Sequence, residues 1–245
     1  MITVSIVSHG HGAMVDQVVQ QLELFPEVGQ IILTRNIPEL SNLRCDGKLE
    51  IIDNHMPAGF GANHNAAFKY CQNSLFCIVN PDITFIHNPF ADLNICLGEN
   101  NADLVVPLVL DIDGKVEDSI RRYPTPFSLL VKAFGGSDGS YPVTLGIKPF
   151  CPEWAAGMFM LFRSRAFCDV NGFDEKFFLY YEDVDICARM HKVGQKIVVC
   201  PSATIVHDAC RASHHHWRYL RWHLASMIRF FCKHLGRLPR SKFDV

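Results

Sequence analysis

The sequence predicts an α/β protein with a mostly parallel central sheet flanked by helices. Short apolar runs typical of buried strands alternate with stretches of helical spacing, and polar or glycine-rich segments follow the strands. Because the carboxyl ends of parallel strands meet at one edge of such a sheet, we expect a ligand site there. A chain of 245 residues can form one large domain with a full core.

Apolar runs and helical spacing locate the individual elements. The segment 13–25 places apolar residues from Met14 to Phe25 on one helical side. A later helix begins at Glu182 and should end near Gly194, a residue suited to a left-handed cap. Strands are expected at residues 2–7, 31–33, 49–52, 76–79, 104–107 and 203–206, and a further helix at 65–72.

Charge and composition exclude several classes of protein. The net charge of −2 argues against a nucleic-acid binder that uses its whole surface. The ten cysteines form no C-x-x-C pair and no zinc-site spacing, so we expect reduced thiols. Met1 leads directly into a strand without a basic leader, and no apolar run reaches the roughly 18 to 20 residues of a membrane span. These features predict a cytoplasmic protein.

The stretch 172–189, GFDEKFFLYYEDVDICAR, organises the chain. A run of large apolar and aromatic residues, 177–181, leads to the carboxylates of Glu182, Asp183 and Asp185 at the first turn of the predicted helix. Asp185 can pair with Arg189 at the i+4 position and is interpreted as structural. An apolar wall raises the pKa of a neighbouring carboxylate and favours a general base. The alternative is an ordinary acidic helix start.

Residues 172–194, GFDEKFFLYYEDVDICARMHKVG, resemble the C-terminal signature of family-2 glycosyltransferases with the GT-A fold. Residues 196–201 and 203–207 extend the match, which covers most of residues 2–207. The resemblance implies a GT-A domain over residues 1–210, followed by a basic helical extension over residues 211–245. It also implies an inverting transfer of a sugar from a nucleotide-diphosphate donor.

The resemblance places the catalytic base at Asp183. Glu182 would then orient the acceptor or hold the loop. The two residues are about 100° apart on a helix, so we expect only one of them to face the acceptor.

Polar and glycine-rich segments after the first strands are candidates for donor binding. The loop SHGHG, with Ser8, His9 and Gly10, is either a backbone approach to a nucleotide or a plain turn. Asn36 stands where the family reads the base, although the adjacent acid of the family is Arg35 here.

The loop from Gly59 to Asn65 is either a backbone nest for the nucleotide or a simple turn. It resembles the family motif G-F-x-x-x-R-N, with His64 in place of arginine and with Gly61 inside the loop. The resemblance therefore makes Gly59, Gly61, His64 and Asn65 donor-site candidates.

A metal site is predicted from two strand ends. Asp82, in Asn80-Pro81-Asp82, could hold a divalent ion against a diphosphate, or it could only form a turn. The resemblance matches this segment to the D-x-D motif of the family, with Asp82 and His207 as ligands of Mg²⁺ or Mn²⁺ and Asn80 near the donor. The triplet 214–216, three histidines, is a weaker candidate because successive helical residues diverge.

The middle of the chain supplies candidates for acceptor and phosphate binding. Arg121 and Arg122 either neutralise phosphates or belong to a solvated basic loop. Trp154 either stacks on a sugar or fills the core. The resemblance assigns Gly157 to the acceptor side, and the Gly- and Ser-rich segment 135–149 is expected to form a flap.

The segment 211–243 is basic, aromatic and free of acidic residues. Its apolar stripe either packs on the core or lies on anionic lipid at the inner face of the cytoplasmic membrane, and different faces could do both. The stripe comprises Trp217, Leu220, Leu224, Met227, Ile228, Phe231 and Leu235.

The C-terminal segment also resembles rhamnosyltransferases, which implies dTDP-rhamnose as the first donor candidate and a UDP-hexose as the second. The acceptor would be a glycan or a lipid-linked glycan of a bacterial surface polysaccharide such as an O antigen. A nucleotidyltransferase is a rival, but residues 8–12 lack the Lys or Arg that it would need. A non-catalytic subunit that binds nucleotide sugars is the other rival.

Overall fold

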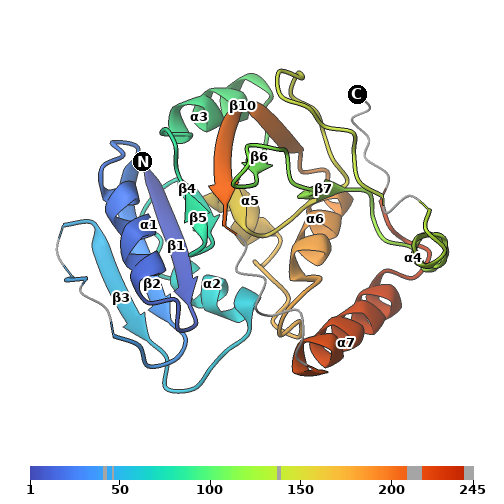
Figure 1. Cartoon of the computed structure of the whole chain (residues 1–245), viewed down its shortest axis with the longest axis horizontal. Coiled ribbons are helices and arrows are strands. Elements are labelled where there is room, and N and C mark those ends of the chain that lie inside the picture. Colours follow the sequence, from blue (N-terminus) through green and yellow to red (C-terminus); the bar gives the residue numbers. More distant parts are fainter. Residues whose placement is uncertain (41–42, 46, 137–138, 209–216, 240–245) are drawn as a thin grey trace.

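The structure is a computed structural model in which an eight-stranded sheet forms the centre of the molecule (Figure 1). It describes residues 1–245 except 41–42, 46, 137–138, 209–216 and 240–245. The sheet runs, in spatial order, through β3 (Leu49–Asp53), β2 (Val28–Arg35), β1 (Ile2–Ser8), β4 (Leu75–Val79), β9 (Phe159–Arg163), β6 (Leu104–Leu110), β10 (Ile197–His207) and β5 (Ile83–Thr84).

Most neighbouring strands are parallel, as the sequence predicts. Only β9 and β5 run antiparallel to their neighbours in this sheet. The register places Ser8 of β1 opposite Arg35 of β2, and β4 ends at Val79 beside them. The polar residues that follow these strands therefore gather at one edge of the sheet.

Helices cover both faces of the sheet, and each face has its own apolar core. Helices α1 (Ala13–Glu23) and α3 (Phe90–Glu99) bury Val19, Leu22 and Phe90 against one face. On the other face lie α2 (Phe60–Phe68), α5 (Ser164–Asp169) and α6 (Glu182–Lys192). A two-stranded sheet of β7 (Ile120–Arg121) and β8 (Trp154–Ala155), together with α4 (Pro126–Ala133), lies beside the main sheet.

The expected strands and the helix from residue 13 are all present, and α6 ends before Gly194, whose φ is +82°. The expectation for residues 59–65 was wrong, because α2 already begins at Phe60 and contains most of the supposed loop. The two asparagines and two glycines of this segment have low helix propensity, so the sequence indicated a loop there. Gly61 is needed for packing, since a Cβ there would lie 2.5 Å from Cβ of Phe173.

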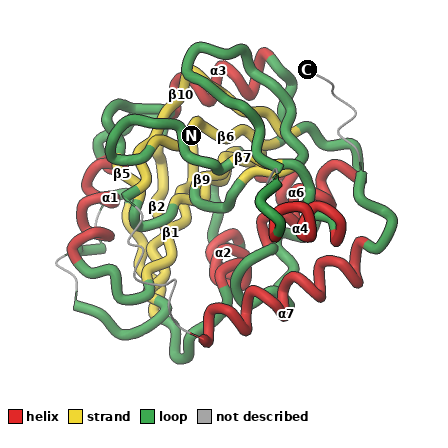
Figure 2. Tube along the Cα trace, turned by 45° about the vertical axis from the view of Figure 1, so that its right-hand side comes forward, coloured by secondary structure: helices red, strands yellow, loops and turns green. Residues whose placement is uncertain are grey.

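The C-terminal helix α7 (Trp217–His234) packs against α6 and against the turn that leads into α6. It lies on the same side of the molecule as α4 and α6 (Figure 2). Its buried residues are Ser226, Phe230 and His234, which are spaced by four residues and form one face. Of the predicted apolar stripe, Met227 and Phe231 pack on the core, and the exposed members are Trp217, Leu220, Leu224, Ile228 and Leu235. Among the helices that the structure describes, none is long and apolar enough to cross a bilayer.

Asp185 joins α7 to α6. Its side chain is fully buried and pairs with Arg189 at 2.7 Å, which confirms the i+4 pair, and with Lys233 at 2.8 Å. His234 Nε2 donates to Asp185 Oδ1 at 2.8 Å, while Lys192 Nζ donates to His234 Nδ1 at 2.7 Å. Burial alone would raise the pKa of Asp185, but the hydrogen bond from His234 and the cations of Arg189 and Lys233 lower it to about 2.

We predict that Asp185→Asn lowers the free energy of unfolding by roughly 3 kcal/mol at pH 7, because it leaves Arg189, Lys233 and His234 without their buried anionic partner. Asp174→Asn is the matched control, since Asp174 also pairs with Lys233 but is partly exposed and should cost less than about 1 kcal/mol.

The effect of Asp185→Asn should also depend on pH. The pKa of Asp185 is lower in the folded protein than the usual value of about 3.9 in an unfolded chain. Its stabilisation is therefore present above about pH 4 and is lost as the pH falls through about 2. Urea unfolding at several pH values would measure the difference, and equal stability of wild type and Asp185→Asn at pH 7 would contradict this role.

Candidate active site

The start of α6 is held in a strained backbone conformation. Tyr180 and Tyr181 have φ values of +70° and +66°, which place two successive aromatic residues in the left-handed region. Such residues cost about 1–3 kcal/mol each and persist where the surrounding structure holds them. The turn directs Glu182 and Asp183, the first residues of the helix, into a cavity.

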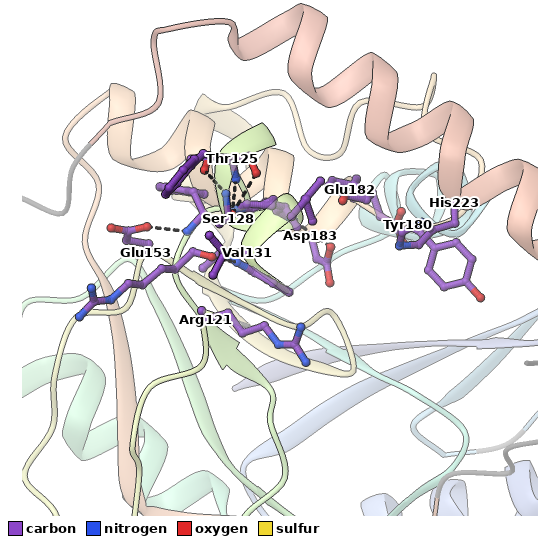
Figure 3. A pocket seen from close by; sticks show the side chains of 18 residues that line it. Arg121, Thr125, Ser128, Val131, Glu153, Tyr180, Glu182, Asp183 and His223 are labelled. Carbon is purple, nitrogen blue, oxygen red and sulfur yellow. Dashed lines mark hydrogen bonds between the residues drawn. The ribbon is translucent and has the colours of Figure 1, made fainter. Parts of the chain in front are cut away.

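This cavity has a volume of about 620 Å³ and lies between α4, α7 and the start of α6 (Figure 3). Both Glu182 and Asp183 line it, and the expectation that only one of them faces the acceptor stays a prediction. The helix meets the cavity with its N-terminal end, and successive residues of the first turn therefore border the same space. Arg121, Arg122 and Trp154 also line the cavity.

Asp183 is the more firmly held of the two acids. Its Oδ2 accepts a hydrogen bond from the backbone N–H of Gly157 at 3.1 Å, and its Oδ1 accepts one from Val184 N at 2.8 Å. A Cβ on Gly157 would lie 3.4 Å from Cβ of Asp183, so the glycine permits this close approach. Burial raises the pKa of Asp183, and the two backbone donors oppose that shift.

Glu182 is 6% exposed, and its Oε2 has no hydrogen-bond partner among the described residues. Burial raises its pKa well above the usual range, and the neighbouring charge of Asp183 adds to the effect. The aromatic run preceding it supplies part of this burial, since Phe177 is fully buried and Tyr181 is 8% exposed. The apolar surroundings expected from the sequence are therefore present.

Cationic and aromatic side chains form the opposite wall of the cavity. Arg121 comes from β7, pairs with Asp118, and extends its guanidinium below Asp183 (Figure 3). Arg122 lies over the ring of Tyr141, 5.5 Å from its centroid. Trp154 donates from Nε1 to the carbonyl of Arg122 at 2.9 Å and is only partly buried, so one part of its ring packs while another borders the cavity.

Asp82 and His207 meet at the edge of the sheet. His207 Nε2 lies 3.1 Å from Asp82 Oδ2, and His207 Nδ1 lies 2.8 Å from Glu117 Oε2. Burial alone would lower the pKa of His207, but the hydrogen bonds and charges of Asp82 and Glu117 raise it to about 9. Glu117 was not identified from the sequence, because nothing in its local pattern distinguishes it from a surface acid.

This arrangement fits a divalent cation. Asp82 Oδ1 is buried and has no hydrogen-bond partner among the described residues. Asp82 Oδ2 and His207 Nε2 are joined by a hydrogen bond of 3.1 Å, which a cation held by these two side chains would replace. A carboxylate on the second ring nitrogen, here Glu117, is typical of metal-binding histidines.

The described residues nevertheless contain no group of three or more His, Cys, Asp or Glu side chains with metal-binding geometry. A cation at Asp82 and His207 would need further ligands from outside the protein, as at a site that is completed by a substrate diphosphate. The histidine triplet 214–216 lies outside the described residues.

The two centres are linked by short segments of backbone. Asn80 N donates to the carbonyl of Met158 at 2.9 Å, and Met158 is next to Gly157, which binds Asp183. Glu117 and Arg121 belong to one five-residue segment, so their Cα atoms are at most about 14 Å apart. The Asp82–His207 pair and the Asp183 cavity thus belong to one region of the molecule.

The expected donor-side residues divide into two groups, those at the ends of β1 and β2 and those in or next to α2. Asn36 is buried beside His9, and its side chain both accepts from the N–H of Ala58 at 2.8 Å and donates to the carbonyl of Ala58 at 3.0 Å. Ser8 precedes the loop in which Gly10 adopts a φ of +81°, which favours glycine. Arg35 is paired with Asp53, an acid on the neighbouring strand, at 2.6 Å.

The residues of α2 make contacts within the protein instead. His64 is fully buried, is bonded to Ser5 at 2.8 Å and has a pKa lowered by burial to about 3. Asn65 is bonded to both backbone groups of Phe173. A Cβ on Gly59 would lie 2.7 Å from the carbonyl oxygen of Phe178. The contacts of His64, Asn65, Gly59 and Gly61 therefore give these residues a packing role, and their assignment to the donor site stays a prediction.

Comparisons with known proteins agree with this architecture. No model of a known protein family matches the chain. The chain is 28% identical to the rhamnosyltransferase WbbL of Escherichia coli over 95% of its own length and 93% of that protein. It is 30% identical to the N-acetylglucosaminyl-diphospho-decaprenol L-rhamnosyltransferase of Mycobacterium tuberculosis, over 56% of the chain and 47% of that protein.

Solved structures of glycosyltransferases share the fold. The structure of GalNAc-T7 with UDP, GalNAc and Mn²⁺ aligns with a TM-score of 0.63 at 14% identity, over 85% of this chain and 44% of that one. TarS 1–349 of S. aureus in complex with UDP-GlcNAc aligns with a TM-score of 0.57 at 13% identity, over 87% and 60%. These likenesses confirm the expected GT-A fold.

Proposed function

We propose that this chain, which is a rhamnosyltransferase-like glycosyltransferase of the GT-A fold, transfers a sugar with inversion from a nucleotide-diphosphate donor to a hydroxyl of a glycan. The observation that carries the proposal is Asp183, a carboxylate with a raised pKa that is fixed by Gly157 at the wall of a large cavity. A base of this kind works best when its pKa is near the working pH.

In this mechanism the acceptor enters the cavity beside Trp154 and Glu182, and its hydroxyl hydrogen-bonds to Asp183. As the oxygen forms a bond to the anomeric carbon, Asp183 takes the proton, and the bond from that carbon to the diphosphate oxygen breaks on the opposite face. Glu182, whose pKa is raised by burial, would orient the acceptor through a hydrogen bond.

The donor would lie along the carboxyl edge of the sheet. Ser8, His9, Gly10 and Asn36 would border the nucleotide, and Asn80 would lie beside the diphosphate. Asp82 and His207 would hold Mg²⁺ or Mn²⁺, which when bound stabilises the negative charge of the leaving diphosphate. Glu117 would orient His207 through the 2.8 Å contact with Nδ1.

The first donor proposed is dTDP-rhamnose, with a UDP-hexose as the second. The similarity to two proteins named rhamnosyltransferases supports the first. The acceptor proposed is a growing surface polysaccharide, and its lipid-linked form would place the reacting hydroxyl at the inner face of the cytoplasmic membrane. Arg121 and Arg122 would then lie where the acceptor diphosphate enters the cavity.

Stereochemistry tests the proposed function directly. With one base and a single displacement, a β-configured L-rhamnose donor should give an α-rhamnoside. A thermal-shift screen of nucleotide sugars would first identify the donor that stabilises the fold. NMR coupling constants of the isolated product would then measure the anomeric configuration, and retention would exclude this mechanism.

We predict that Asp183→Asn lowers kcat by about 10²–10⁴, because the amide cannot accept the proton. Donor affinity should stay near that of the wild type, whereas the free energy of unfolding should fall by about 1–3 kcal/mol, because the amide can accept only one of the two backbone hydrogen bonds that Asp183 accepts. Glu182→Gln should lose less in kcat and should raise KM for the acceptor. Asp169→Asn, which alters an exposed acid far from the cavity, is the control.

These variants are distinguished by single-turnover kinetics with the identified donor. The roles of the two acids would have to be exchanged if Asp183→Asn kept more than about a tenth of wild-type kcat while Glu182→Gln was inactive.

Metal binding gives an independent prediction. Asp82→Ala should abolish the Mn²⁺-dependent part of donor affinity, and His207→Ala should weaken it less severely. Glu117→Ala should reduce metal affinity by about 10–100-fold, because it removes only the group that orients His207. Isothermal calorimetry with Mn²⁺ and the nucleoside diphosphate measures this without turnover, and unchanged affinity in Asp82→Ala would overturn the site.

A further inference from the structure

The outer face of α7 carries an apolar surface that no described part of the chain covers. Trp217 is 72% exposed, Leu220 54%, Leu224 44% and Ile228 59%. We call these four residues the outer stripe. A soluble surface rarely gathers so many large apolar side chains on one helix, and such patches mark interaction sites.

The helix cannot turn to bury the outer stripe. Its inner face is held by the Asp185 cluster through His234, and by Ser226, whose Oγ donates to the carbonyl of Leu179 at 2.9 Å. Phe230 is fully buried against Tyr181, with ring centroids 5.5 Å apart. Rotation of α7 would break all of these contacts.

The charged side chains that α7 itself carries have one sign. Arg218, Arg221 and Arg229 are exposed beside it, and the sequence has no acidic residue between positions 217 and 239. Arg221 lies over the ring of Trp217, 5.8 Å from its centroid, and Arg218 lies over Trp222 at 6.0 Å. Arginine and tryptophan interleaved with leucine and isoleucine are typical of helices that lie in a membrane interface.

The cavity of the active site opens close to this helix. His223, one residue before Leu224 of the outer stripe, lines the cavity together with Phe127 of α4. Phe127 is itself 75% exposed, and Phe134, just after α4, is 89% exposed. Exposed aromatic side chains on α4 and an exposed apolar stripe on α7 thus adjoin a cavity that contains Asp183.

We propose that the outer stripe of α7 is a docking surface for a lipid bilayer that contains anionic lipids. The apolar side chains would enter the boundary between headgroups and acyl chains, and the arginines would contact the lipid phosphates. Basic charge without any acid on α7 favours this occupant over a second copy packed stripe to stripe, because that contact would bring the arginines of the two copies together.

Docking would bring the mouth of the cavity to the membrane plane. This consequence rests on the proposed function, because it matters for an acceptor that is carried by a lipid. The inner face of the same helix contacts the strained turn, since the ring of His223 lies 5.3 Å from Tyr180 and 5.4 Å from Tyr181. The helix therefore connects the bilayer to the residues that position Glu182 and Asp183.

The test is sedimentation of the full chain with vesicles, without donor or acceptor. Wild type should bind vesicles of phosphatidylcholine and phosphatidylglycerol, bind pure phosphatidylcholine weakly, and lose affinity as salt rises. Leu224→Glu/Ile228→Glu should abolish binding. The matched control is Leu24→Glu/Ile95→Glu, which alters exposed apolar residues just after α1 and on α3 and should bind as the wild type does.

A second variant tests the contribution of the arginines without adding a charge to the apolar stripe. Arg218→Gln/Arg221→Gln keeps the apolar stripe and should reduce affinity for anionic vesicles by about five-fold per arginine, or about 25-fold in all. Transfer to a water-soluble acceptor should be unchanged in Leu224→Glu/Ile228→Glu, so loss of vesicle binding is distinguishable from loss of catalysis.

Three results would overturn the proposal. One is equal binding of wild type to neutral and anionic vesicles, and another is equal binding of Leu224→Glu/Ile228→Glu and its control. The third is a wild-type dimer that becomes monomeric in Leu224→Glu/Ile228→Glu by sedimentation velocity, which would assign the outer stripe to self-association.

Discussion

The left-handed turn at Tyr180 and Tyr181 is the constraint on which the arrangement of the cavity depends. Two aromatic residues in this conformation are unfavourable by themselves, so contacts from elsewhere must hold them. Those contacts come from α7: His223 packs on both rings, Phe230 packs on Tyr181, and Ser226 binds the carbonyl of Leu179. The helix that looks like an appendage in the sequence therefore stabilises the start of α6.

The same principle explains the Asp185 cluster. Contacts that are costly to break hold α7 on α6. The fully buried carboxylate of Asp185 pairs with Arg189, Lys233 and His234, and separating the two helices would break its pairs with Lys233 and His234. The inner face of α7 is thus committed to α6, and its outer face is left with large apolar side chains. This division leaves α7 with an inner face that contacts the turn before the two acids and an outer face that we propose as the surface for lipid.

The chemistry of the site was only partly predictable from the sequence. The aromatic run before Glu182 predicted the apolar surroundings of that carboxylate, and the position of Asp82 after a strand predicted that it lies near His207 at the edge of the sheet. By contrast, the pairing of His207 with Glu117, and the hydrogen bond from Gly157 to Asp183, join residues 90 and 26 positions apart. No local pattern specifies such pairs, because they depend on how the strands and loops come together.

The sequence alone determined the alternation of strands and helices, the polar edge of the sheet and the i+4 pair of Asp185 with Arg189, since these follow from local periodicity and spacing. Tertiary structure decided the rest. It made residues 60–68 a helix packed on Phe173, buried His64, and placed both acids on one cavity because α6 meets that cavity end on. It also chose which face of α7 is buried. The buried face is the one on which Ser226 and His234 form hydrogen bonds with the turn before α6 and with α6 itself. The free energy of these polar contacts cannot be read from the spacing of apolar residues in the sequence.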